Sequence, residues 1–127
     1  MSLKRVLVID DDPIALGYIF DLLKDLYSVS LYPGGTGVPK VIEKTSPDLI
    51  ITDHFMDGMT GLEICQWVRD REISNDIPII MTSANPAGST IEQECLEAGA
   101  SQFMTKGFDP NALIETVETL LNKKESG

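Results

Sequence analysis

The chain has 127 residues, which is enough for one domain with a hydrophobic core but too few for two. Hydrophobic residues make up 43% and charged residues 24% of the chain, and these proportions exclude a disordered or fibrous protein. The formal net charge of -10 at pH 7 repels phosphate backbones and anionic lipid surfaces, so we expect no direct nucleic-acid binding. No apolar stretch approaches the ~20 residues needed to span a bilayer, so we expect no membrane insertion.

The predicted elements alternate between strand and helix from the N-terminus. Residues 6–9 form an apolar run of strand length, and Asp12-Pro13 then supplies a helix N-cap and a proline at the first helical position. The helix carries apolar residues at helical spacing, namely Ile19, Leu22, Leu23 and Leu26. A weak strand at 28–32 and a short helix at 38–44 follow.

The same alternation continues to the C-terminus. A β-branched strand is predicted at 49–52, and Thr60-Gly61-Leu62-Glu63 is a capping box that begins the third helix. A fourth strand spans 77–82, a second capping box at 89–92 begins the fourth helix, and a fifth strand spans 101–105. The last helix has an N-cap and an apolar stripe, made of Asp109-Pro110, Leu113, Val117, Leu120 and Leu121.

These strands are continuously apolar, which is typical of a parallel sheet covered by helices on both faces. Right-handed crossovers then predict an open, doubly wound α/β fold. Such folds bind their ligands beyond the carboxyl ends of the strands. The polar residues at those ends are Asp10, Asp11, Asp12, Asp53, Ser83 and Lys106. The sequence therefore predicts the functional site at this edge of the sheet.

The adjacent acids Asp10 and Asp11 indicate a cation site, because a bound cation offsets their mutual repulsion. No His or Cys accompanies them, so the hard oxygen donors favour Mg²⁺, or Mn²⁺, over zinc. Asp12 is interpreted as a helix cap instead.

Asp53 and Lys106 suggest chemistry at phosphorus. A carboxylate beside a cation is a competent nucleophile, although Asp53 could also be a third metal ligand or a turn residue. Lys106 can pair with Asp53 and with phosphoryl oxygens, or it can be an ordinary solvated lysine. The hydroxyl of Ser83 can hydrogen-bond a phosphoryl group at the same edge.

Taken together, these residues resemble the receiver domain of two-component response regulators, of the chemotaxis-regulator type, over essentially the whole chain. The resemblance depends on Val8-Ile9-Asp10-Asp11-Asp12-Pro13, Thr52-Asp53, Met59-Thr60-Gly61-Leu62-Glu63, Met81-Thr82-Ser83-Ala84 and Met104-Thr105-Lys106. It implies a flavodoxin-like fold of five parallel strands in the order 2-1-3-4-5 with five helices.

The resemblance also implies a role for each acid. Asp53 would be the phosphoacceptor. Asp11, the carboxylate of Asp53 and the backbone carbonyl of Phe55 would bind Mg²⁺ directly, and Asp10 would bind it through water.

The remaining site residues would sense the phosphoryl group. Ser83 would be the switch hydroxyl, and the backbone N–H of Ala84 would face the phosphoryl group. Lys106 would provide the counter-charge and Phe103 would be the switch aromatic. Their movement would reshape the face made by the fourth helix, fifth strand and fifth helix.

The partner implied is a histidine kinase or a histidine phosphotransfer protein. The domain would catalyse only its own phosphotransfer and autodephosphorylation, so it is not a conventional enzyme. We expect it to be cytoplasmic, as a monomer or a phosphorylation-linked dimer, with its two cysteines reduced and its output domain or downstream protein undefined. One domain would span 1–127, where 1–3 can be of vector origin and 124–127 form a tail.

The chain departs from the family at several positions. Gly107 stands where proline is usual, so we expect either a trans Lys106–Gly107 bond with a rearranged loop or a strained cis bond. Asp57-Gly58 adds flexibility and charge after the acceptor. The segment 33–37 predicts a mobile loop before a short second helix. Phe55 is interpreted as a barrier to water that lengthens the phosphoryl lifetime, and His54 as a surface residue.

Three other functions remain open. A haloacid-dehalogenase-type phosphatase would use Asp10 and Asp12, but the chain is short for that fold. An FMN module would place its phosphate against Asp10, Asp11 and Asp12, where like charges oppose it. A pseudo-receiver would bind partners without being phosphorylated.

Overall fold

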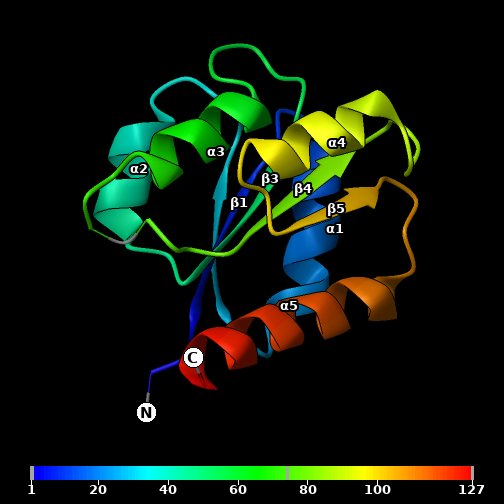
Figure 1. The fold of residues 1–127 in the computed structure, drawn as a ribbon. Coiled ribbons are helices and arrows are strands. Elements are labelled where there is room, and N and C mark those ends of the chain that lie inside the picture. Colours follow the sequence, from blue (N-terminus) through cyan, green and yellow to red (C-terminus); the bar gives the residue numbers. More distant parts are fainter. Residues whose placement is uncertain (1, 74, 127) are drawn as a thin grey trace.

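The computed structural model describes residues 2–73 and 75–126, so the expected domain ends Met1 and Gly127 lie outside the described residues. A five-stranded parallel sheet runs through the middle of the molecule (Figure 1). Its strands are β1 (Arg5–Ile9), β2 (Ser28–Tyr32), β3 (Leu49–Asp53), β4 (Ile79–Ser83) and β5 (Gln102–Thr105). Their order is β2-β1-β3-β4-β5, which confirms the predicted fold.

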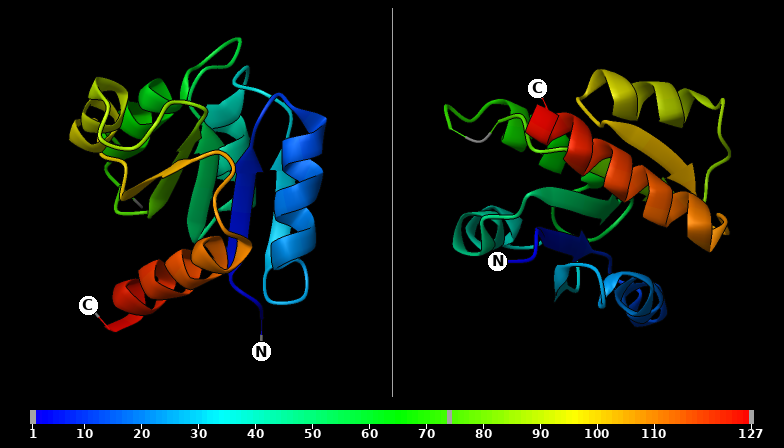
Figure 2. Two further views of the ribbon diagram at one scale, coloured as in Figure 1. Left: turned by 90° about the vertical axis from the view of Figure 1, so that its right-hand side faces the viewer. Right: turned by 90° about the horizontal axis from the view of Figure 1, so that it is seen from below.

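Five helices cover the two faces of the sheet (Figure 2). They are α1 (Pro13–Leu23), α2 (Val38–Thr45), α3 (Gly61–Arg69), α4 (Thr90–Glu97) and α5 (Pro110–Ser126). Apolar residues of α1 and α5 pack on one face, and those of α2, α3 and α4 pack on the other. The sheet is therefore buried on both sides, as its continuously apolar strands predict.

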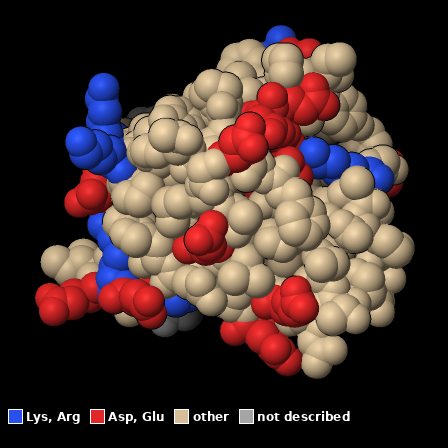
Figure 3. Space-filling model, turned by 90° about the horizontal axis from the view of Figure 1, so that it is seen from above, with Lys and Arg blue, Asp and Glu red and all other residues tan. Residues whose placement is uncertain are grey.

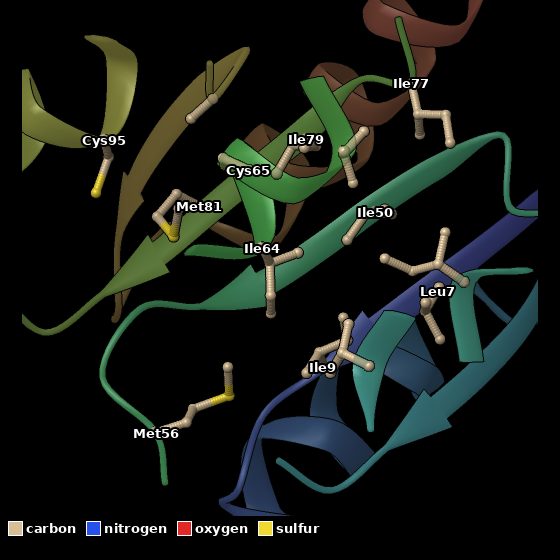
Figure 4. Packing of buried hydrophobic residues seen from close by; sticks show 14 of the residues in the cluster. Leu7, Ile9, Ile50, Met56, Ile64, Cys65, Ile77, Ile79, Met81 and Cys95 are labelled. Atoms are coloured by element: carbon tan, nitrogen blue, oxygen red, sulfur yellow. The ribbon is translucent and has the colours of Figure 1, made fainter. Parts of the chain in front are cut away.

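Alternate residues of each central strand pack into the two hydrophobic cores, one on each face of the sheet. Leu7, Ile50 and Ile79 pack with α2, α3 and α4 (Figure 4), whereas Val8 and Ile51 pack with α1 and α5. All five of these side chains are essentially inaccessible to solvent. This burial anchors the strands, so the residues just beyond their carboxyl ends emerge from a rigid base.

The helices begin where the capping residues predict. The side chain of Asp12 accepts a hydrogen bond from the backbone N–H of Ile14, which makes Asp12 the N-cap of α1. Thr60 and Glu63 form the complete capping box of α3. The predicted second box is only half formed, because the carboxylate of Glu92 accepts from the backbone N–H of Gly88 and not from that of Ser89.

Both cysteines lie in the core, on α3 and α4. Burial raises the pKa of the Cys65 thiol to about 12 and raises that of Cys95 as well, so both thiols are protonated at neutral pH. Among the described helices, none has the length and apolar character needed to cross a membrane.

The glycine-rich segment before α2 contacts the loop that follows β3. Gly35 and Gly58 form a parallel bridge, and the backbone N–H of Gly35 donates to the carbonyl of Asp57 at 3.2 Å. A Cβ on Gly58 would lie 2.6 Å from the backbone nitrogen of Thr36. Only glycine permits this close approach of two backbones. The segment that the sequence predicts to be mobile thus has a specific backbone partner.

Candidate functional site

Three acidic residues converge at the carboxyl edge of the sheet. Strands β1 and β3 are neighbours with Ile9 opposite Thr52, so the residues that follow, Asp10 and Asp53, are also side by side. Together with Asp11, each offers a carboxylate oxygen within 4.8 Å of the others. Asp10 and Asp53 are 1% and 7% exposed, whereas Asp11 is open to solvent. Figure 3, which views the molecule from above, shows acidic side chains gathered beside basic ones.

Lys106 joins the two buried carboxylates. Its Nζ lies 3.1 Å from Oδ2 of Asp10 and 3.2 Å from Oδ1 of Asp53. The backbone N–H of Lys106 donates to the carbonyl of Ser83 at 2.7 Å. This bond continues the pairing of β4 with β5 and sets the position of the Lys106 backbone. The sheet therefore positions the backbone of Lys106, and the two carboxylates hold its ammonium group.

Burial and neighbouring charges have opposing effects on the pKa values of Asp53 and Lys106. Burial and the neighbouring charge of Asp10 raise the pKa of Asp53, although Lys106 acts in the opposite direction. For Lys106, burial lowers the pKa, but its contacts with Asp10 and Asp53 outweigh burial and raise it. Two carboxylates thus share one ammonium group, which leaves the site with an excess of negative charge.

The donor atoms fit a divalent cation that prefers oxygen. Oδ1 of Asp10 accepts from the backbone N–H of Asp12 at 2.9 Å, which orients the carboxylate. Oδ2 of Asp10 is buried and has no hydrogen-bond partner among the described residues, although it is ion-paired with Lys106. Such an atom retains coordinating capacity, and the excess negative charge favours a cation. Asp10, Asp11 and Asp53 could hold Mg²⁺ or Mn²⁺.

The loop after β3 forms the other wall of the site. Asp11 and Phe55 line a hollow of about 290 Å³ together with Met56, Asp57 and Thr60. The side chain of Phe55 is 57% exposed, and its ring lies 4.0 Å from that of His54 between centroids. An apolar ring therefore stands at the rim of the acidic cluster.

The prediction of a surface position for His54 is wrong. The side chain is only 4% exposed, and the ring atom Nδ1 has no hydrogen-bond partner among the described residues. Its backbone N–H donates to Thr82 at 3.2 Å, and its carbonyl accepts from Gly61 at 2.7 Å. His54 follows the end of β3, and its burial shows that protein instead of solvent covers this position.

Ser83 ends β4 and is 1% exposed, and Ala84 follows it at the surface. The hydroxyl of Ser83 donates to Oδ1 of Asn85 at 3.1 Å, and it accepts from the backbone N–H of Asn85 at 3.1 Å. Asn85 was not among the predicted site residues, and its position two residues beyond Ser83 was the only signal for it.

Phe103 lies buried in the core beneath α4, 5% exposed.

Gly107 adopts a conformation that favours glycine, with φ of 93°, and no peptide bond among the described residues is cis. Of the two alternatives for this loop, the trans bond is the one observed. Lys106 still reaches both carboxylates, so the glycine does not displace the ammonium group.

A second hollow, of about 220 Å³, opens on the α1 side of Lys106. Its lining includes Ile14, Tyr18 and Phe108, and the rings of Tyr18 and Phe108 lie 6.5 Å apart between centroids. Ile14 is 80% exposed. The sequence did not predict this surface, because its two halves come from opposite ends of the chain.

Comparison with known proteins gives one consistent family. The family model described as "Response regulator receiver domain" matches residues 6–118. The heme response regulator HssR of Staphylococcus aureus is 34% identical over 123 residues, which cover 94% of this chain and 52% of HssR. The chain therefore spans about half the length of the curated relatives it matches.

Solved structures agree with this assignment. The chemotaxis response regulator CheY4 of Vibrio cholerae has a TM-score of 0.85 and 28% identity, covering 94% of this chain and 99% of CheY4. A CheY-like receiver domain protein from Methanospirillum hungatei has a TM-score of 0.88 and 25% identity, covering 98% of each chain.

Proposed function

Because this chain belongs to the response regulator receiver family, we propose that it accepts a phosphoryl group on Asp53 from the phosphohistidine of a histidine kinase or phosphotransfer protein. The observation that carries the proposal is the joint position of Asp10, Asp11 and Asp53 within 4.8 Å, with Lys106 Nζ 3.2 Å from Asp53. The domain is then a signalling component and not a conventional enzyme.

The three acids would hold Mg²⁺ or Mn²⁺, with Asp11 and Asp53 as direct ligands and Asp10 acting through water. The carbonyl of Phe55, a residue in the same hollow as Asp11, would be a further ligand. When bound, the cation neutralises the charge that spreads over the equatorial phosphoryl oxygens.

In the transfer, a carboxylate oxygen of Asp53 forms the new O–P bond as the N–P bond of the phosphohistidine breaks, and the imidazole leaves with the electron pair. Lys106 pairs with Asp53 beforehand and would then bind the phosphoryl oxygens, because the modified carboxyl has lost its charge. The backbone N–H of Ala84 would donate to the same oxygens. The catalytic contribution of these residues is positioning and charge stabilisation.

The phosphoryl group would draw the hydroxyl of Ser83 toward the site and rearrange the face formed by α4, β5 and α5. Phe103, as the switch aromatic, would adjust with it. An output domain or separate downstream protein would respond to this face, with the domain acting as a monomer or as a phosphorylation-linked dimer. The proposal places this event in the cytoplasm, without direct nucleic-acid contact by this domain.

The phosphohistidine protein must approach Asp53 over the carboxyl edge. The exposed residue Ile14 and the partly exposed residue Phe108 border the hollow beside Lys106, and this apolar surface would contact the phosphohistidine protein.

Mass spectrometry tests the proposal directly. Treatment with acetyl phosphate and Mg²⁺ should add one phosphoryl group, and the Asp53→Asn variant should remain unmodified. A parent protein that never acquires phosphate would make this chain a pseudo-receiver. Steady hydrolysis of a phosphate ester with Asp10 labelled would instead make it a phosphatase.

A further inference from the structure

The single proton of the Ser83 hydroxyl is engaged before any phosphoryl group arrives. It donates its only proton to Oδ1 of Asn85 at 3.1 Å and accepts from the backbone N–H of the same residue at 3.1 Å. A serine hydroxyl has a single proton to donate. Ser83 therefore has none to offer to a group on Asp53 while its bond to the Asn85 side chain persists.

Asn85 is itself held in place by the neighbouring strand. The backbone carbonyl of Asn85 accepts a hydrogen bond from the hydroxyl of Thr105 at 3.1 Å. Thr105 lies opposite Ser83 in the pairing of β4 with β5, and the backbone N–H of Lys106 donates to the carbonyl of Ser83 at 2.7 Å. The backbone of Asn85 is thus held beside Ser83 by the same strand end that carries the lysine of the site.

We propose that Asn85 is a positioning residue that restrains Ser83, so that its side-chain oxygen competes with the phosphoryl oxygens for the Ser83 proton. The inference rests on the proposed phosphorylation of Asp53. A charged phosphoryl oxygen is a stronger hydrogen-bond acceptor than the Asn85 amide oxygen, so the Ser83 hydroxyl donates to it when it is present. Breaking the bond to Asn85 nevertheless lowers the net gain, and Asn85 thereby keeps the unmodified domain in its resting conformation.

The Asn85→Ala variant isolates this contact. It removes the Oδ1 acceptor but keeps the backbone N–H that donates to Ser83 and the carbonyl that accepts from Thr105. Asn85 is only half-buried in a loop, so the variant should fold. The test is calorimetric titration with beryllium fluoride, a phosphoryl mimic, in excess Mg²⁺. The variant should bind beryllium fluoride about three- to tenfold more tightly than the parent, because this factor corresponds to the free energy of one neutral hydrogen bond.

A double-mutant cycle distinguishes restraint of Ser83 from a general effect on the loop. In a Ser83→Ala background the Asn85→Ala substitution should leave beryllium fluoride affinity unchanged, because no hydroxyl remains to restrain. The matched control Asn122→Ala makes the same change at an exposed position of α5 and should behave as the parent.

The beryllium fluoride affinities of these variants separate the role of Asn85 from the phosphorylation of Asp53. Unchanged affinity in Asn85→Ala, or an equal gain with and without the Ser83 hydroxyl, overturns the role of Asn85 while the phosphoacceptor proposal stands. Failure of the parent to bind beryllium fluoride and to be phosphorylated on Asp53 overturns both. Tighter binding that depends on Ser83 supports the inference.

Discussion

Lys106 lies 3.2 Å from Asp53 even though glycine follows it in the chain. Its place is set before Gly107, by the backbone bond from Lys106 to Ser83 at the end of the β4–β5 ladder. The loop that follows is therefore free to turn through a positive φ without moving the ammonium group. The contact between Lys106 and Asp53 therefore forms without a proline after the lysine.

We expect Lys106→Ala to destabilise the unmodified domain. The variant leaves Asp10 and Asp53, both buried, without their shared counter-charge, so the free energy of unfolding in urea at pH 7 should fall by about 1–2 kcal/mol. The loss should shrink at acidic pH, because protonation of Asp53, whose pKa is raised chiefly by burial, removes a charge that Lys106 offsets. Lys24→Ala, which removes an exposed pair with Asp21, is the control and should cost less than about 0.5 kcal/mol. Equal losses in both variants would contradict a special role for Lys106 in stability.

Asp53→Asn should stabilise the protein at neutral pH. The pKa of Asp53 is raised, chiefly by burial, so the folded state binds its proton more tightly than the unfolded state does. Stability is therefore lost as pH rises through the raised pKa, and the neutral amide avoids this loss. We expect the unfolding midpoint at pH 7 to rise by about 3–5 °C, the effect of roughly 1 kcal/mol.

The same gain should disappear at low pH, below the pKa of Asp53 in the unfolded chain, where the acid is neutral in both states. Asp57→Asn makes an identical change on an exposed carboxylate and should shift the midpoint little. A gain in Asp53→Asn that persists unchanged at low pH would show that charge is not its cause.

The sequence predicted the fold and the acidic cluster because both depend on local patterns. Apolar runs such as residues 6–9 and 49–52 are long enough to define strands, and the residue after each strand necessarily lies at the carboxyl edge. Parallel pairing then brings Asp10 beside Asp53. No knowledge of the loops was needed for this step.

The features that the sequence did not predict all arise from contacts between distant elements or from loop geometry. Alternation along the strand did not reveal that protein covers His54. The bond between Ser83 and Asn85 requires the turn after β4, and the approach of Gly35 to Gly58 requires two loops to meet. A pattern read along one segment contains no information about such encounters.

Phe55→Asn tests whether the aromatic ring keeps water from the phosphoryl group. Phe55 lies at the rim of the acidic cluster and shares a hollow with Asp11. We expect the polar variant to lose phosphate roughly three- to tenfold faster than the parent after the donor is removed, measured by mass spectrometry over time. Phe55→Leu retains apolar bulk and should resemble the parent. A phosphate half-life in Phe55→Asn as long as that of the parent would count against the hypothesis.

Arg69 should contribute strongly to the stability of the fold. Its guanidinium donates to the carbonyls of Gly99, Asn75 and Ile77 at 2.7–3.0 Å, and so joins α3 to the segments before β4 and β5. Arg69→Ala should lower the free energy of unfolding by about 2–3 kcal/mol in a urea titration. The nearby Arg71 lies 4.9 Å from the ring centroid of Trp67, and Arg71→Ala should cost only about 0.5–1 kcal/mol. Similar costs at the two positions would mean that the carbonyl bonds contribute little.

Gly58 and Gly88 provide a comparison that separates backbone strain from packing. Their φ angles are 82° and 83°, so alanine is strained to the same degree at both. A Cβ on Gly88 would meet nothing within 4 Å, whereas one on Gly58 would lie 2.6 Å from the backbone of Thr36. Gly88→Ala should therefore cost about 1 kcal/mol of unfolding free energy, and Gly58→Ala about 2–3 kcal/mol more. Equal costs in a urea titration would show that the loop at 33–37 moves away freely, and that its backbone bridge does not restrain the loop carrying Phe55.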